Sequence, residues 1–413
     1  MNKIFNYIKV RREEWIFYVI TYLLLLLKAG FFFNENLSAI TSIAFLVLLL
    51  FLKQHRHCTI NSVAVKFVIA LIVLQFLTQC VCGFPQATIY FLGIVNILTV
   101  LLYVSVMPLE IFPRVFSNII LSVSIVSLVC VLSGRLGFPF YQYFPVLTNS
   151  QGNSVYFLGL AEVWTSYNSA FGANRLQGIF WEPGAFQAFI IFAALFDIYR
   201  INVNKEKLIR LLVYAITIFF TYSTTGYICI LIVGIIYIIQ LSRYSWLSLI
   251  VVIPIGYILI MSFSSQSDDF LYYTMFGKLD EANAALSYRA ENTASSRVDA
   301  IVYPLEAFAE SPVFGIGVEG KEKLSQQLGQ SMFTCTTVNY FANYGLLCGL
   351  IHLFGFISFL RLKRKTALEA IVLVICVFST TMSESFAFNP IFEVLCIYGY
   401  YIYYYNQQTF NYI

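Results

Sequence analysis

Residues 208–241 read LIRLLVYAITIFFTYSTTGYICILIVGIIYIIQL, an almost continuously apolar segment that is interrupted once by the small and polar residues Ser223–Gly226. Each half is close to the length that an α-helix needs to cross a hydrocarbon core of roughly 30 Å. The segment therefore predicts two adjacent membrane-spanning helices that are joined by a tight turn.

Similar apolar runs occur along the whole chain, which is 59% hydrophobic and only 11% charged. That charge content is about half of what an ordinary soluble domain carries. The spans are predicted at 15–33, 37–52, 67–82, 88–106, 115–133, 185–199, 208–223, 226–241, 246–263, 336–360, 367–381 and 390–405. The predicted fold is an all-α polytopic membrane protein of about twelve transmembrane helices, with residues 1–413 as a single membrane domain.

The basic residues predict how these helices are oriented. If the N-terminus lies in the cytoplasm, most of the 25 lysines and arginines fall on the cytoplasmic side, among them the runs 200–210 and 361–365. This asymmetry follows the positive-inside rule, and both termini are then cytoplasmic. The net charge of +4 is weak and scattered, so a nucleic-acid partner is not expected.

Most of the polar sequence outside the cytoplasm then falls in two large loops, about 134–184 and 264–335, which we expect to cap the helix bundle. The first ends in NRLQGIFWEPGAFQAF, where Arg175 and Glu182 precede a predicted span and Pro183 suits the first turn of a helix. Ionisable groups at a membrane mouth usually face a cavity, so both are candidate site residues. The alternative is an interfacial ion pair that orients the helix.

In the second loop Arg297 is the strongest candidate, because its planar guanidinium can bind a phosphate or pyrophosphate with two hydrogen bonds. An exposed loop arginine is also often merely solvated. The amphipathic pattern VDAIVYPLEAFAE follows Arg297, and GIGVEG is interpreted as a turn because no strand precedes it. Asp268–Asp269 is a minority candidate for a cation site; no metal and no cofactor are expected.

The three histidines, His55, His57 and His352, fall in a predicted cytoplasmic loop or inside a span. A general base on the outer side would therefore be a carboxylate or something weaker. Aromatic residues of the first loop, Tyr141, Tyr143, Trp164 and Tyr167, could stack on sugars or belong to the interfacial belt.

Four segments in order give the chain its resemblance to a known family. They are RLQGIFWEPGAFQAF at 175–189, YSTTGYICILIVGI at 222–235, SSRVDAIVYPLEAFAESPVFGIGVEG at 295–320 and TTVNYFANYGLLCGLI at 336–351. Together they resemble the superfamily of O-antigen polymerases (Wzy-type) and O-antigen ligases, over about the C-terminal 60% of the chain.

This resemblance implies a GT-C-like membrane glycosyltransferase of the bacterial cytoplasmic (inner) membrane. It implies an inverting, metal-independent transfer at the outer face, with an undecaprenyl-pyrophosphate-linked oligosaccharide as donor and a lipid-linked repeat unit as acceptor. By analogy, Arg175 and Arg297 hold the pyrophosphate and Glu182 orients Arg175 or acts as base. Further candidate substrate-binding residues are Arg289, Tyr340 and Glu384. Membrane lipid, a chain-length regulator and a flippase are the expected partners.

The sequence departs from the ligases of this superfamily, which carry a histidine before the Tyr…Gly-Leu segment. Here the same neighbourhood reads MFTCTTVNYF. We therefore predict a polysaccharide repeat-unit polymerase, with an O-antigen ligase-type transferase as the alternative. A flippase or transporter of lipid-linked oligosaccharide is the competitor from a different class, although the two halves of the chain show no matching repeats.

Overall fold

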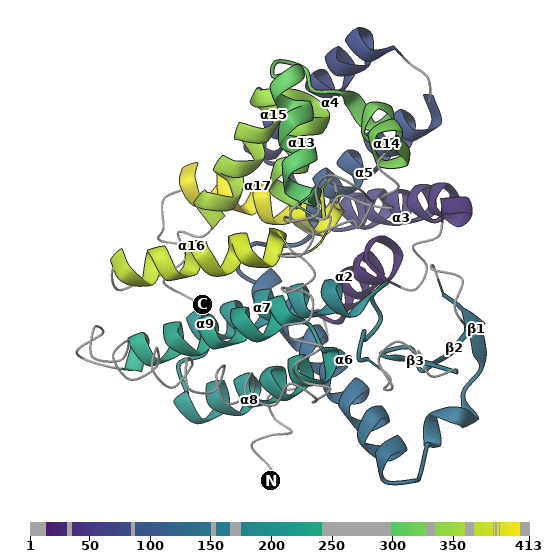
Figure 1. The fold of residues 1–413 in the computed structure, drawn as a ribbon, viewed down its shortest axis with the longest axis vertical. Coiled ribbons are helices and arrows are strands. Elements are labelled where there is room, and N and C mark those ends of the chain that lie inside the picture. Colours follow the sequence, from purple (N-terminus) through teal and green to yellow (C-terminus); the bar gives the residue numbers. More distant parts are fainter. Residues whose placement is uncertain are drawn as a thin grey trace, which may run out of the picture.

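In the computed structural model the chain folds into a bundle of α-helices with one small β-sheet at its side (Figure 1). The structure describes residues 14–30, 35–83, 87–149, 154–165, 175–241, 299–327, 335–359, 367–382, 384, 386–387 and 389–404. In the first half of the chain the described helices are α2 (Trp15–Lys28), α3 (Glu35–His55), α4 (Ser62–Cys82), α5 (Ala87–Val106) and α6 (Phe112–Arg135). The later helices are α7 (Pro183–Arg200), α8 (Asn204–Thr221), α9 (Thr224–Leu241), α13 (Asp299–Glu310), α14 (Gly317–Gln327), α15 (Thr336–Phe359), α16 (Ala367–Met382) and α17 (Pro390–Tyr404).

Every predicted span coincides with a described helix except 246–263, which lies outside the described residues. Within the described part of the chain, three helices are long and apolar enough to cross a membrane, judged by length and composition: α4, α6 and α15. Five shorter apolar helices accompany them, in α2, α3, α5, α9 and α16. The tight turn in the segment 208–241 is confirmed, because only Tyr222 and Ser223 separate α8 from α9.

Helix α7 lies at the centre of the bundle. Every side chain from Gly184 to Ile198 is buried, as expected of a helix that is apolar on all sides and surrounded by others. Its neighbours are α6, α8, α9 and α16. Phe189 packs edge-on to Phe392 of α17. The position of α7 therefore fixes the positions of Pro183, its first residue, and of Glu182, which precedes it.

Helix α15 is bent rather than straight. Tyr344 and Gly345 depart from helical geometry, and Gly345 has φ 77°, a left-handed value that favours glycine. The bend brings Tyr340 onto His352, with ring centroids 3.7 Å apart, although the two residues lie on opposite sides of the bend. The predicted single span 336–360 is thus two helical pieces with a sharp corner between them.

The turn that precedes α14 packs into this corner. The backbone N–H of Leu346 donates to the carbonyl of Pro312 at 2.8 Å, and that of Ile316 donates to Ala342 at 2.9 Å. Thr78 of α4 donates its hydroxyl to the carbonyl of Phe314 at 2.8 Å. The interpretation of GIGVEG as a turn was right only for its first half, because α14 begins at Gly317.

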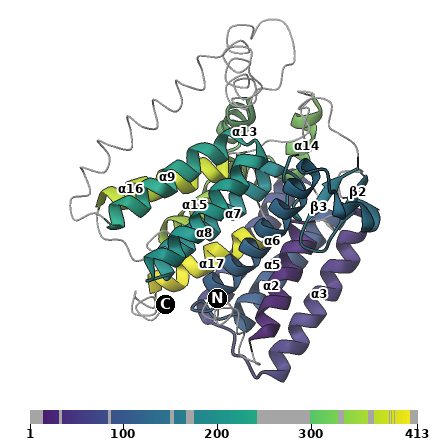
Figure 2. The same ribbon diagram turned by 90° about the horizontal axis from the view of Figure 1, so that it is seen from below.

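The first loop contains a three-stranded antiparallel sheet that an all-α prediction did not include. It consists of β1 (Val146–Thr148), β2 (Ser154–Phe157) and β3 (Glu162–Trp164), preceded by a 3₁₀ turn, η1 (Phe140–Tyr143). Each strand is only three or four residues long, which is too short for a clear alternating pattern in the sequence. We call the end of the bundle beside this sheet, where α6 ends and α7 begins, the cap end (Figure 2).

Candidate functional site

Arg175 is fixed at the cap end by the last turn of α8. Its Nε donates to the carbonyl of Thr221 at 2.9 Å and its Nη2 to the carbonyl of Tyr222 at 3.1 Å. The carbonyls at a helix C-terminus lack intrahelical partners, so a guanidinium there satisfies them and also complements the helix dipole. Two directional bonds hold Arg175 in a defined orientation between the first loop and the α8–α9 turn.

Glu182 precedes the first turn of α7. Its backbone carbonyl accepts the N–H of Phe186 at 3.1 Å, and its carboxylate accepts the indole N–H of Trp181 at 2.9 Å. A carboxylate at a helix N-terminus is stabilised by the positive end of the dipole. Arg175 and Glu182 are therefore oriented by different partners, α8 and Trp181, rather than by each other.

Glu384 reaches the same helix N-terminus from the far end of the chain. Its Oε1 lies directly against Gly184, where an added Cβ would clash with that oxygen. Thr336 ties the segment down: its hydroxyl donates to the carbonyl of Glu384 at 2.6 Å and accepts the N–H of Phe386 at 2.8 Å. The structure thus brings Glu182 and Glu384, which are distant in sequence, to the start of α7.

Tyr340 lies inside the bundle rather than on its surface. It is 1% exposed, its hydroxyl donates to Oε1 of Glu393 at 3.1 Å, and its ring stacks on His352. The imidazole Nε2 of His352 lies 3.0 Å from both oxygens of Glu393. These contacts form a buried polar cluster between α15 and α17, which the sequence did not predict because His352 and Glu393 are 41 residues apart.

Other predicted site residues have different outcomes. Arg289, Arg297 and Asp268–Asp269 lie outside the described residues, as does Tyr167. Of the aromatic candidates, Tyr143 is 87% exposed, whereas Trp164 packs against the hydrophobic core.

Lys28 is a buried cation that the sequence interpretation passed over. It is 3% exposed, and its ammonium donates to Asn96 Oδ1 at 2.7 Å and to the hydroxyl of Ser42. Its carbonyl accepts the side-chain N–H of Asn389 at 2.8 Å, which ties the end of α2 to the segment after Glu384. A lysine within an otherwise apolar run was the available signal.

The segment before Glu182 is tied to the small sheet by a buried acid and amide. Gln177 Nε2 donates to Glu162 Oε1, and the N–H of Glu162 donates to the carbonyl of Gly178 at 2.8 Å. Burial raises the pKa of Glu162 to about 8. Glu162 Oε2 and Gln177 Oε1 are both buried and lack a hydrogen-bond partner among the described residues.

The raised pKa of Glu162 predicts that the protein loses stability as the pH rises. The unfolded carboxyl, with an ordinary pKa of 4.5, is ionised at neutral pH while the folded one keeps its proton up to about pH 8. The contribution of this group to stability is then highest below pH 4.5 and falls towards pH 8, by on the order of 5 kcal/mol in total. Thermal unfolding of the purified protein measured from pH 5 to 9 should show this decline, and Glu162→Gln should flatten it.

Glu319→Gln provides the control for that experiment. Glu319 forms an exposed i,i+4 ion pair with Lys323 on α14 at 2.8 Å, so its replacement should leave the pH dependence unchanged. Equal slopes for the wild-type protein and Glu162→Gln would show that Glu162 is ionised in the folded state.

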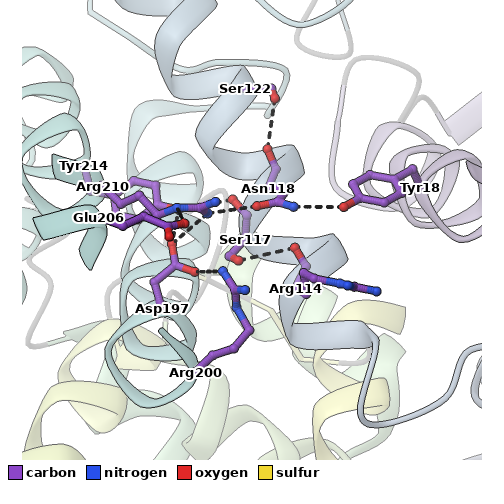
Figure 3. Close-up of polar contacts among 10 residues, drawn as sticks. All are labelled: Tyr18, Arg114, Ser117, Asn118, Ser122, Asp197, Arg200, Glu206, Arg210 and Tyr214. Carbon is purple, nitrogen blue, oxygen red and sulfur yellow. Dashed lines mark hydrogen bonds and ion pairs between the residues drawn. The ribbon is translucent and has the colours of Figure 1, made fainter. Parts of the chain in front are cut away.

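Another polar network, centred on Asp197, lies at the end of the bundle opposite the cap end. Figure 3 shows its residues. Asp197 of α7 is 0% exposed and forms ion pairs with Arg200 at 2.8 Å and Arg210 at 3.3 Å. The hydroxyl of Tyr214 lies 3.0 Å from Asp197 Oδ2, and Arg210 also pairs with Glu206 at 3.2 Å. These contacts join α7 to α8 at the end farthest from Arg175.

Asn118 extends this network to α2. Its side-chain oxygen accepts Arg210 Nη1 and its amide N–H donates to the hydroxyl of Tyr18, both at 2.8 Å (Figure 3). At the same end, Arg114 pairs with Glu14 at 2.8 Å. The basic run 200–210, interpreted as a cytoplasmic signal, is thus also a structural element whose arginines are neutralised by carboxylates.

Part of the chain is similar to a known protein family. Residues 209–344, about a third of the chain, match the family model Wzy_C, described as O-antigen ligase. The matched range contains the α8–α9 turn, Arg289, Arg297 and Tyr340, whereas Arg175, Glu182 and Glu384 lie outside it. No curated protein matches the chain. Residues 209–344 are therefore similar to the O-antigen ligase family, whose enzymes are membrane glycosyltransferases that act as polysaccharide polymerases or ligases.

Proposed function

We propose that this protein is a polysaccharide repeat-unit polymerase. It transfers a glycan from undecaprenyl pyrophosphate onto a lipid-linked repeat unit at the outer face of the bacterial cytoplasmic membrane. The observation that carries the proposal is the grouping at the cap end: Arg175 is held by the end of α8, while Glu182 and Glu384 meet at the start of α7. The range that matches the O-antigen ligase family model, residues 209–344, begins within α8.

The chemistry of this transfer suits an arginine beside carboxylates. The bond between the anomeric carbon and the pyrophosphate oxygen breaks, and the acceptor hydroxyl oxygen forms the new glycosidic bond with inversion. Negative charge develops on the departing pyrophosphate, where a preoriented guanidinium stabilises it without any metal ion. The acceptor hydroxyl loses its proton to a carboxylate, for which Glu182 is the first candidate and Glu384 the second.

The proposed orientation places both termini in the cytoplasm and the cap end outside. Arg114, Arg200 and Arg210 lie at the end opposite the cap, which agrees with an excess of basic residues on the cytoplasmic side. The donor's pyrophosphate would then meet Arg175 at the outer surface, where lipid-linked glycans present their headgroups.

A ligase is the second candidate, because the matching family model is described as O-antigen ligase. The residue composition around the start of α15 favours the polymerase. Thr336 stands in the neighbourhood where ligases of the superfamily carry a histidine, and its hydroxyl is used to hold the segment of Glu384 and Phe386.

Deletion of the gene followed by gel analysis of the surface polysaccharide tests the proposal. Cells without the protein should make only single repeat units, and the wild-type gene should restore long chains. Complementation with Glu182→Gln or Arg297→Ala, at equal membrane abundance, should restore few or none. Long lipid-linked chains that accumulate without reaching their final acceptor would instead identify a ligase.

A further inference from the structure

A second arginine reaches the α8–α9 turn from another part of the chain. Arg135, the last residue of α6, donates from Nη2 to the hydroxyl of Tyr222 at 3.0 Å. Its guanidinium carbon lies 4.8 Å from the centroid of the Phe220 ring, a cation–π distance. The side chain is therefore held by the residues that end α8.

Arg135 and Arg175 meet at the same short segment. Arg175 binds the carbonyls of Thr221 and Tyr222, and the N–H of Leu176 donates to the carbonyl of Phe220 at 3.0 Å. One arginine thus contacts the side chain of Tyr222 and the other its backbone. Tyr222 has φ 50°, a conformation that is uncommon for a residue other than glycine and is often found at functional sites.

The two arginines at the α8–α9 turn, Arg135 and Arg175, both carry positive charge. Among the described residues, Arg135 forms no ion pair with a carboxylate. Arg135 is also exposed to solvent at the cap end. A guanidinium carries five N–H donors, of which the contact with Tyr222 uses one. Helix α9 begins at Thr224, so the positive end of its dipole adds to the same region.

We propose that Arg135 is a second anion-binding residue of the donor site, acting with Arg175 on a phosphate or pyrophosphate group. The inference rests on the proposed function and extends it by naming a residue outside the range 209–344 that matches the family model. Two guanidinium groups that both contact Tyr222 bind a diphosphate better than one, because the dianion neutralises both charges. Arg135 at a helix C-terminus would also stabilise α6 without any ligand, so the test must measure binding.

The test is a binding titration of the purified full-length protein with farnesyl pyrophosphate, a soluble short-chain analogue of the lipid donor. We expect Arg135→Gln to weaken binding about tenfold, which corresponds to about 1.4 kcal/mol, at a temperature at which the variant is still folded. Tyr222→Phe, which removes only the hydroxyl that holds Arg135, should weaken binding to a smaller extent. The wild-type affinity should fall with salt more steeply than that of Arg135→Gln.

Arg56→Gln is the matched control, because Arg56 also lies 4.8 Å from an aromatic ring, that of Phe17, but at the opposite end of the bundle. The affinity of the Arg56→Gln variant for farnesyl pyrophosphate should equal that of the wild type. Inorganic pyrophosphate and phosphatidylglycerol in nanodiscs separate the sources of the anion. Weaker binding of both pyrophosphate compounds to Arg135→Gln supports the proposal, whereas an effect limited to phosphatidylglycerol overturns it in favour of a lipid-headgroup contact.

The failure of this inference differs from a failure of the proposed function. If Arg135→Gln binds farnesyl pyrophosphate like the wild type while Arg175→Gln does not, Arg135 is outside the site and the proposed function stands. If neither replacement changes the affinity, the donor is not bound at this turn, and both the inference and the assignment of Arg175 fail.

Discussion

Replacing Arg175 by glutamine is expected to reduce polymer formation by about 10²-fold to 10³-fold, the usual cost of removing one preoriented donor from a developing oxyanion. Nε and Nη2 of Arg175 are bonded to two successive carbonyls, which leaves the rest of the guanidinium in a fixed orientation. Glutamine has neither the charge nor the reach to replace both contacts. The measurement is the length distribution of lipid-linked and surface polysaccharide on gels, normalised to membrane abundance.

Two further variants make this result specific. Arg175→Lys keeps the charge but cannot bind both carbonyls, so it should remain strongly impaired if orientation matters. Arg114→Gln removes an arginine that pairs with Glu14 at the opposite end, and polymer length should be unchanged. Normal chain lengths in cells with Arg175→Gln would eliminate Arg175 from the site.

Replacing Asp197 by alanine is expected to destabilise the protein by about 3–5 kcal/mol. Its carboxylate is fully buried and is shared by Arg200, Arg210 and the hydroxyl of Tyr214. Without it, two guanidinium groups remain close together and largely buried, with side-chain exposures of 16% and 12%. Thermal unfolding in detergent and membrane abundance should both show the loss.

Glu206→Ala is the comparison for Asp197. Glu206 pairs with the same Arg210, but its side chain is 22% exposed, so the change should be below about 1 kcal/mol. Equal melting temperatures for the two variants would show that burial of Asp197 contributes little and that Arg200 and Arg210 find solvent or other partners.

The sequence was sufficient to predict most of the helices, because hydrophobic length is a local property of the chain. Pro183, expected in the first turn of a helix, begins α7, whereas the turn predicted at Ser223–Gly226 lies at Tyr222–Ser223 because α9 already begins at Thr224. The amphipathic stretch that begins at Asp299, which the sequence analysis left within a loop, forms helix α13. In each of these places a few neighbouring residues carry all the necessary information.

Contacts between distant segments were not predictable in this way. The approach of Glu384 to Gly184 depends on how α7 packs beside the segment between α16 and α17, and the contact of Arg135 with Tyr222 spans 87 residues. The small sheet was missed because its strands are short, and its acid–amide pair joins Glu162 to Gln177, which lie 15 residues apart. One sequence without aligned relatives does not reveal such pairs.

The bend of α15 at Gly345 has a consequence for engineering this protein. The Pro312–Ile316 turn is hydrogen-bonded to both arms of the bend, so this turn and α15 are packed together as one unit. A chimera that takes the Pro312–Ile316 turn from a relative but keeps its own α15 would pack that turn against a bend with which it did not evolve. Grafts intended to change product specificity should therefore carry residues 311–346 as one cassette.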